Sequence, residues 1–477
     1  MSRESERLFD AITQIDDELL PSAERPKRRL PSWRAFVAAA AILAIILSPF
    51  VIHIGSRTTV EEAANGTEPF ALAQPVYPVM TAYPADGGDY QAWWADVKKQ
   101  TDQPEGYADS LRGFMGQSIR EYLSGTDGEN RAYSPANVYM ALAMLAETTG
   151  GESRAQILHL LGAESIDALR AQAGSVWNAN YRDDGLKKSV MASSLWLRND
   201  RDYRQQTVDA LAQNYYASVY RGEMGSAAFN QTLQDWLNEQ TGGLLADQSG
   251  EEAFDPSTAL GLASTICFQA KWISPFMAED TAPGVFHAPG GDVTADFMHK
   301  YEDMMGYYRG ERFGAIGLPL ESDGEMWFIL PDEGVTPEAL LQDADAMRFM
   351  TESKQDWPDC KTAIVNLSMP KFDAAGRFSL IDGLKAMGVR DILDPAEADF
   401  SPVAEDSAGL YLSDANHAVR VAIDEEGVIA AAYTMMVVGE GAPDPDIRID
   451  FTLDRPFLYV ISGHADVPLF AGIVNQP

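Results

Sequence analysis

The amino-acid sequence predicts an α+β fold, in which helices and strands are mixed without a regular alternation. A helix is expected from Pro135, which follows the N-capping residue Ser134, to the glycine pair at Gly150. A strand is expected at residues 326–330, a short apolar run that begins after a turn and ends at a proline. Because another helix then begins near Thr336 without a strict repeat of strand and helix, an α+β domain is favoured over a doubly wound one.

The composition is that of a folded and strongly acidic protein. The chain has 477 residues, of which 46% are apolar and 22% are charged, enough to bury a large core. Its 36 Lys and Arg residues against 71 Asp and Glu residues give a formal charge of −35, which argues against nucleic acid as a partner. The two cysteines, Cys267 and Cys360, are too few for a disulfide framework or a cysteine-based zinc site, and we expect two unpaired thiols.

The chain is predicted to have three segments ahead of its folded domain. Residues 1–33 are expected to be a cytoplasmic segment with a short amphipathic stretch. Residues 34–55 are predicted to be a transmembrane helix, because residues 36–54 contain no Asp, Glu, Lys or Arg and are about long enough to cross a bilayer. Residues 56–105, rich in Ala, Pro, Gly, Asp and Thr, are expected to be an extracytoplasmic stem, and residues 106–477 the folded domain.

Basic residues ahead of the apolar stretch set its predicted orientation. Acidic sequence follows the stretch, whereas the residues before it include Lys27, Arg28, Arg29 and Arg34. Positive charge is retained in the cytoplasm, so everything after residue 55 is expected outside the cell. A cleaved signal peptide is the alternative, but the 35 preceding residues are unusually many for one. The sequence therefore predicts a single-pass plasma-membrane protein.

The sequence contains no recognisable pattern of catalytic or metal-binding residues. The six histidines form no HExxH or clustered ligand pattern, and there is no GxSxG elbow, no phosphate-binding GxxxxGK[ST] loop and no EF-hand loop. A Ser-His-Asp triad assembles in space and not in sequence, so a hydrolase remains a distant alternative. We therefore predict neither an enzyme nor a bound metal or cofactor.

A strand, a turn and a second, uncharged apolar segment are expected after residue 416. Within residues 417–423, large aliphatic side chains alternate with small or charged ones, which is the period of a strand. Glu425-Glu426-Gly427 then ends this strand. Residues 428–438 (VIAAAYTMMVV) follow without a charge, and their even-numbered members share one small, apolar face. This segment is either a buried strand or a strand that is exposed in one state and inserted into a sheet in another.

Several blocks of this sequence resemble the serpin family and occur in the family's order. The block SPANVYMALAML at 134–145 resembles the family's second helix, and FQAKWISPF at 268–276 resembles the end of a central strand of its main sheet. The further blocks are MPKF (369–372), LKAMGV (384–389), ADFSP (398–402), HAVRVAIDEEG (417–427), DRPFLYVI (454–461) and LFAGIVNQP (469–477). Collinear blocks from about residue 106 to the end are far more specific than any single motif.

The resemblance implies both a fold and a function. The implied fold is the serpin fold, with three β-sheets, about eight or nine helices and an exposed reactive-centre loop near the C-terminus. The implied function is that of a monomeric serine protease inhibitor, whose cleaved loop enters the main sheet while the protease is attached as an acyl-enzyme. A membrane-anchored bacterial member is expected, and the nearer alternative is a non-inhibitory serpin that acts as a surface-binding or chaperone-like module.

The resemblance also implies which residues carry the function. The hinge of the loop comprises Glu425, Glu426, Gly427, Val428, Ala430, Ala431, Ala432 and Thr434. The place where the sheet opens comprises Ser134, Asn137, Ser264, Trp272 and His417. Because the family usually has a serine in place of Asn137 and an asparagine in place of Ser264, this exchange is predicted to preserve one hydrogen-bonded pair.

The expected reactive bond lies between Gly441 and Ala442, with the bond after Glu440 as the alternative. A small residue before the cut suits an elastase-like or subtilisin-like protease, whereas Glu440 suits a glutamate-specific one. The stretch 427–446 contains no Lys or Arg, which disfavours a trypsin-like target.

Overall fold

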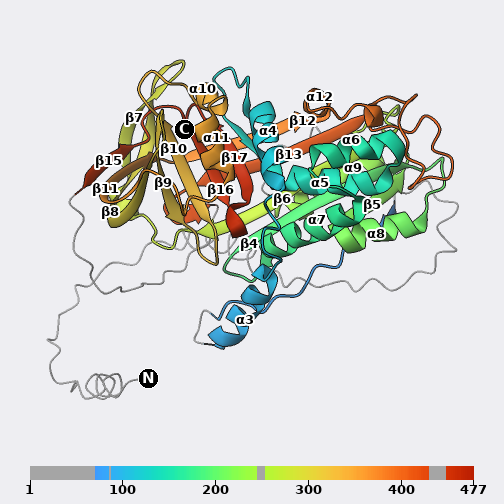
Figure 1. The fold of residues 1–477 in the computed structure, drawn as a ribbon, viewed down its shortest axis with the longest axis horizontal. Coiled ribbons are helices and arrows are strands. Elements are labelled where there is room, and N and C mark those ends of the chain that lie inside the picture. The colour runs from blue at the N-terminus through green and yellow to red at the C-terminus, as the bar shows by residue number, and fades with distance from the viewer. Residues whose placement is uncertain (1–69, 85–87, 244–252, 429–446) are drawn as a thin grey trace, which may run out of the picture. The chain divides into compact units, whose positions relative to one another are not determined.

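Two β-sheets and ten α-helices make up the part of the chain that the computed structural model describes, which is residues 70–84, 88–243, 253–428 and 447–477 (Figure 1). This part belongs to one compact unit, Thr67–Pro477. Its helices are α3 (Tyr90–Thr101), α4 (Leu111–Leu123), α5 (Pro135–Thr148), α6 (Gly151–Leu160), α7 (Ile166–Asn180), α8 (Gln205–Tyr215), α9 (Ala227–Gln240), α10 (Pro337–Leu341), α11 (Ala344–Thr351) and α12 (Ile381–Ala386). The number of helices slightly exceeds the eight or nine expected.

The first sheet has eight strands in the order β1-β5-β4-β6-β14-β13-β12, with β3 paired to β4. Its strands are β1 (Phe70–Ala73), β3 (Arg182–Asp183), β4 (Lys188–Arg198), β5 (Ala217–Gly222), β6 (Leu260–Lys271), β12 (Phe372–Ser379), β13 (Asp414–Ile423) and β14 (Gly427–Val428). The two-residue strand β14 lies between the long strands β6 and β13.

The second sheet has nine strands in the order β15-β11-β8-β9-β10-β16-β17-β2, with β7 paired to β8. Its strands are β2 (Arg131–Tyr133), β7 (Ala282–Ala288), β8 (Gly291–Arg309), β9 (Phe313–Pro319), β10 (Glu325–Pro331), β11 (Cys360–Pro370), β15 (Arg448–Thr452), β16 (Phe457–Ser462) and β17 (Pro468–Val474). Two sheets stand where three were expected, because the 19-residue strand β8 pairs in turn with β7, β11 and β9 and so keeps the hydrogen bonding continuous.

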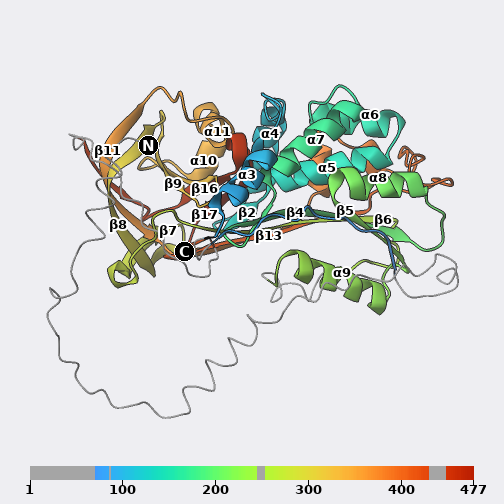
Figure 2. The same cartoon turned by 90° about the horizontal axis from the view of Figure 1, so that it is seen from below.

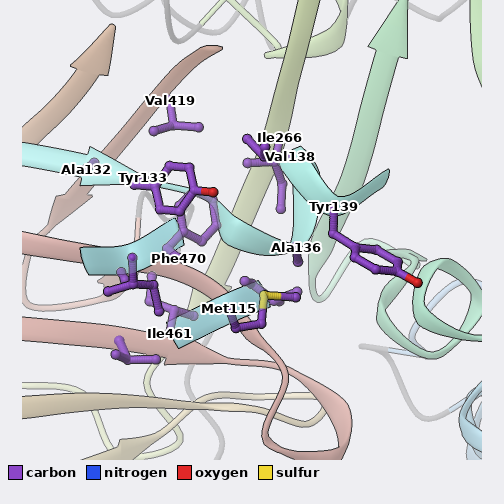
Figure 3. Close-up of a cluster of buried hydrophobic side chains, with 14 of the residues drawn as sticks. Met115, Ala132, Tyr133, Ala136, Val138, Tyr139, Ile266, Val419, Ile461 and Phe470 are labelled. Atoms are coloured by element: carbon purple, nitrogen blue, oxygen red, sulfur yellow. The ribbon is translucent and has the colours of Figure 1, made fainter. Parts of the chain in front are cut away.

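Helices cover both faces of the first sheet. Figure 2 shows α5, α7 and α8 on one face and α9 on the other. The core lies between the two sheets, where Ile266 of β6 and Val419 of β13 belong to the same buried cluster as Tyr133 of β2 and Phe470 of β17 (Figure 3). The face of β6 and β13 that carries Ile266 and Val419 is therefore the inward face of the sheet.

The local signals in the sequence predicted several elements well. Helix α5 begins at Pro135 because the Ser134 hydroxyl accepts a hydrogen bond from the amide of Asn137 at 3.3 Å. Strand β10 covers the predicted run 326–330, and α10 follows the N-capping residue Thr336. These predictions are confirmed.

The predicted stem, residues 56–105, differs from the structure in its second half. Strand β1 pairs with β5 at the edge of the first sheet, and α3 follows the N-cap Asp89, whose side chain accepts from Ala92. The indole Nε1 of Trp93 in α3 donates to the buried Asp184 at 3.0 Å. The prolines of this segment lie outside residues 90–101, so they do not prevent a helix there. Burial of an aromatic side chain then attaches this helix to the folded part.

The structure does not support the predicted membrane location. The segment 36–54, on which that prediction rests, lies outside the described residues. No helix in the part of the chain that the structure describes is both long and apolar enough to cross a bilayer, so a single-pass plasma-membrane protein is not supported. An apolar run has the hydropathy of a span, but hydropathy by itself does not establish one.

Candidate functional site: the seam between two central strands

A seam runs between β6 and β13 in the middle of the first sheet. From Gly261 to Thr265 the residues of β6 pair directly with Asp414 to Ala418 of β13, in parallel. Beyond this direct pairing the two strands diverge, and β14 occupies the space between them. We call the direct pairing the seam, and the place where β14 lies between β6 and β13 the mouth of the seam.

Gly427, the glycine predicted to belong to the hinge, lies in the mouth. Gly427 pairs with Lys271, and Val428 pairs with Ala270 of β6 on one side and Ile423 of β13 on the other. Gly427 has a φ of 155°, and a Cβ at this position would lie 2.7 Å from the Cα of Lys271. Only glycine fits this close approach to the neighbouring backbone.

A tight turn leads the chain from β13 into the mouth. The Asp424 carboxylate accepts hydrogen bonds from the amides of Glu426 at 2.9 Å and Gly427 at 3.2 Å. The buried Trp272 holds the turn from the other side, since its indole donates to the Asp424 carbonyl and its amide to the Glu426 carbonyl, both at 3.0 Å. Trp272 therefore lies beside the turn that leads into Gly427.

Glu425 anchors the same turn to the second sheet. Its Oε1 lies 2.7 Å from the Lys371 ammonium and accepts from the Thr281 hydroxyl at 2.7 Å. Burial alone would raise the pKa of Glu425, but the bonds from Lys371 and Thr281 outweigh it and leave the pKa below its usual value. The carboxylate thus stays charged and paired at neutral pH. Lys371 belongs to the recognised MPKF block, yet its role as the partner of Glu425 was missed.

Three of the polar residues predicted at the opening meet in the seam, near its end that faces the mouth. The amide of Ser134 donates to Nε2 of His417 at 3.1 Å, and Nδ1 of His417 lies 3.1 Å from the Ser264 hydroxyl. Because Nε2 accepts, we assign the ring proton to Nδ1, which donates to Ser264. Burial lowers the pKa of His417 to about 3, so the ring is neutral at physiological pH.

Asn137 does not form the predicted pair with Ser264. Its side chain is fully buried, and neither its amide nitrogen nor its oxygen has a hydrogen-bonding partner within the described residues. The Ser264 hydroxyl is instead taken by His417. The exchange of the two residue types therefore leaves the serine in the cluster and the amide of Asn137 unsatisfied, at a cost of about 1–3 kcal/mol.

The burial of His417 makes stability depend on pH in a defined window. An unfolded histidine has a pKa of about 6.5, so between about pH 3 and 6.5 the unfolded chain binds the additional proton. We expect the contribution of neutral His417 to be complete above pH 6.5 and to fall by about 1.4 kcal/mol per pH unit as the pH drops toward 3.

Thermal unfolding at pH 7, 6 and 5 of the protein and of His417→Gln checks this expectation. The variant is expected to be less stable at pH 7, because it alters the bonds to Ser134 and Ser264. Its free energy of unfolding is also expected to depend less on pH, because it lacks the group that binds one additional proton on unfolding. Equal slopes in the two proteins would contradict the assigned neutral, buried histidine.

Helix α9 covers the other face of the seam. Leu233 and Leu237 of α9 line a small pocket with Ala263 of β6 and with Asn416 and Ala418 of β13. A strand that entered the seam would therefore pass beneath α9.

The remaining predicted site residues lie outside the described part of the chain. They are Ala430, Ala431, Ala432 and Thr434 of the hinge and Glu440, Gly441 and Ala442 at the expected reactive bond. Among the described residues, no group of His, Cys, Asp and Glu side chains is arranged to hold a metal ion. The two thiols are unpaired, Cys267 buried and Cys360 exposed.

Comparison with known proteins gives one consistent family. The family model described as Serpin (serine protease inhibitor) matches residues 111–477. Serpin-Z6C of Oryza sativa subsp. japonica is 27% identical over 73% of this chain and 91% of its own length, and plasminogen activator inhibitor 1 of Bos taurus is 26% identical over 79% and 94%. The native structure of a thermophilic serpin, tengpin, has a TM-score of 0.69 and 22% identity, covering 79% of this chain and 95% of that one. The predicted bacterial, membrane-anchored type finds no support in the two sequence relatives, one from a plant and one from a mammal.

Proposed function

The chain belongs to the serpin family, and from that premise we propose that it inhibits a serine protease by trapping it during cleavage of the reactive loop. The protease would attack the bond at Gly441–Ala442, or the one after Glu440, and form an acyl-enzyme on the loop. The freed hinge would then enter the seam between β6 and β13 before water releases the protease.

The observation that carries this proposal is the position of β14. Gly427 and Val428 are already paired as a strand between β6 and β13, so insertion needs no new starting point. Only the direct pairs from Gly261–Asp414 to Thr265–Ala418 stand between the mouth and the far end of the seam. A strand of about 3.3 Å per residue can therefore extend from β14 by replacing these pairs.

The registers of β14 predict where the inserted residues would go. Continued along both neighbours, Ala430 would face Phe268 and Val421, Ala432 would face Ile266 and Val419, and Thr434 would face Ser264 and His417. All six neighbours are at least 96% buried. The inward positions need small, uncharged side chains, which is what Ala430, Ala432 and Thr434 supply.

Residues around the expected cut suggest the class of target. Gly441 suits elastase-like and subtilisin-like proteases, Glu440 suits glutamate-specific ones, and the lack of Lys and Arg from 427 to 446 disfavours trypsin-like ones. We propose a monomeric inhibitor that needs no cofactor and forms a covalent complex with its protease.

Incubation of the full chain with one protease of each class tests the proposal. We expect a complex that survives denaturing gel electrophoresis with an elastase-like, subtilisin-like or glutamate-specific enzyme, together with a released C-terminal peptide whose mass locates the cut. Cleavage of the loop by every class without such a complex would overturn inhibition and favour a non-inhibitory serpin with a binding or chaperone-like role.

A further inference from the structure

The end of β6 at Ala270 and Lys271 lies apart from β13 and has contacts besides those with β14. At Ala270 and Lys271 the strand β14 intervenes, so β6 and β13 are two strand spacings apart, about 9–10 Å, whereas at Thr265 they are adjacent. A two-residue strand is a weak spacer, because so few hydrogen bonds hold it. The contacts of β6 beyond the mouth therefore decide whether this width persists.

The turn between β9 and β10, residues 319–325, binds the end of β6 through the backbone. The amide of Glu321 donates to the Lys271 carbonyl at 2.9 Å, and the amide of Ile273 donates to the Pro319 carbonyl at 3.0 Å. These bonds bracket Trp272, which itself forms a bridge with Leu320. The end of β6 is thus paired to the second sheet directly beside the mouth.

The same turn binds the start of β4, the other neighbour of β6. The Lys187 ammonium donates to the Asp323 carbonyl, and the amide of Lys187 donates to the buried Asp184 carboxylate at 2.9 Å. The next residue of β4, Lys188, pairs with Gln269 of β6. One turn therefore holds both strands on the same side of the mouth.

Asp323 is itself held by a contact with His464. Its Oδ2 lies 3.0 Å from Nδ1 of His464, and the backbone amide of His464 donates to the Asn180 side chain at 2.9 Å. The turn is closed by Gly324, whose φ is 103° and where a Cβ would lie 2.7 Å from the carbonyl oxygen of Ser462. The turn is therefore a platform that contacts η6 (His464–Asp466) on one side and the first sheet on the other.

Charge strengthens this platform. Lys187 is only 5% exposed, and burial lowers the pKa of its ammonium to about 8 against the opposing influence of Asp323. For Asp323, burial would raise the pKa, but His464 and Lys187 outweigh it and lower the value. The Lys187 ammonium is bonded to the backbone carbonyl of Asp323 and attracted by the Asp323 carboxylate, so removing either side chain leaves a buried charge less compensated.

We propose that the turn 319–325 is a brace, in which Lys187 and Asp323 are positioning residues that hold β4 and β6 apart from β13 and keep the mouth open for the hinge. This inference rests on the proposed function and adds to it the element that sets the speed of insertion. With the brace intact, insertion extends β14. With the brace broken, β6 moves toward β13 and the hinge must reopen the mouth. Insertion is then slower, and a larger fraction of the acyl-enzyme is hydrolysed before the protease is trapped.

The test uses Lys187→Met and the nearly isosteric Asp323→Asn, with Arg198→Gln as the matched control. Arg198 lies at the opposite end of β4 in a partly exposed ion pair with Asp200. For a protease that forms the complex, we expect the number of inhibitor molecules consumed per protease trapped to rise at least threefold in both brace variants. The control is expected to match the unaltered protein, and the rate of initial loop attack is expected to be unchanged in all three.

A second measurement separates the brace from general damage and from the proposed function. Asp323→Glu, which keeps the charge, is expected to restore trapping in part. Unchanged stoichiometry in Lys187→Met and Asp323→Asn, or an equal fall in the rate of loop attack, would overturn the brace. If the unaltered protein forms no complex and its cleaved form gains no thermal stability, it is the proposed function that fails.

Discussion

Cutting the loop between residues 438 and 446 is expected to raise the midpoint of thermal unfolding by roughly 10 °C or more. Insertion of residues 429–438 would add a strand with two bonded neighbours, and would replace only the five direct pairs of the seam. At about 1 kcal/mol net for each of about ten hydrogen bonds gained, the cleaved form is more stable by about 10 kcal/mol. An unfolding entropy of about 2 cal/mol/K per residue converts this gain into that shift.

A metalloprotease is the right reagent for this experiment. It uses metal-bound water and forms no acyl-enzyme, so it cuts the loop without being trapped. Mass spectrometry locates the cut, and calorimetry of the intact and nicked protein gives the two midpoints. A nicked protein that melts at or below the midpoint of the intact one would contradict insertion into the sheet.

The variant Ala430→Arg is expected to lose trapping almost completely and to become a substrate. The registers of β14 put residue 430 against Phe268 and Val421, which are 4% and 1% exposed. A guanidinium there would be buried without a partner at a cost of several kcal/mol, enough to slow insertion by more than tenfold. The protease would then leave with its activity restored.

The adjacent variant Ile429→Arg supplies the control. Residue 429 would face Gln269 and Ala422, which are partly exposed, so its charge would reach water. We expect Ile429→Arg to keep at least most of the trapping, as judged by the denaturant-resistant complex on a gel. Equal loss in both variants would mean that insertion does not follow the register of β14, and retention in both would mean that it does not occur.

Much of the seam could be predicted because it depends on local sequence. Ser134 and Pro135 fix the start of α5 and so place Ser134 under β13, and the alternation in 417–423 predicts the strand that brings His417 inward. Gly427 was recognisable as a break, and its close approach to β6 explains why a glycine stands there.

The rest depends on contacts between distant segments, which sequence patterns do not encode. The sequence around Asn137 does not predict that Ser264 bonds to His417. This bond leaves the side-chain amide of Asn137 without a partner among the described residues. Lys187 and Asp323 are 136 residues apart, and their meeting follows only from the two sheets being packed together. Helix α3 was missed for another reason. The prolines around it predicted an irregular stem, although Asp89 is an N-cap and the run after it contains no proline.

Amide hydrogen exchange on the intact and loop-cleaved protein tests the central claim most directly, namely that the loop enters the sheet between β6 and β13. After cleavage, the amides of residues 429–438 are expected to exchange as slowly as those of β6 and β13, since each would be bonded within a central strand. The claim would be contradicted if residues 429–438 exchanged freely in the cleaved protein while β6 and β13 kept the protection they have in the intact one.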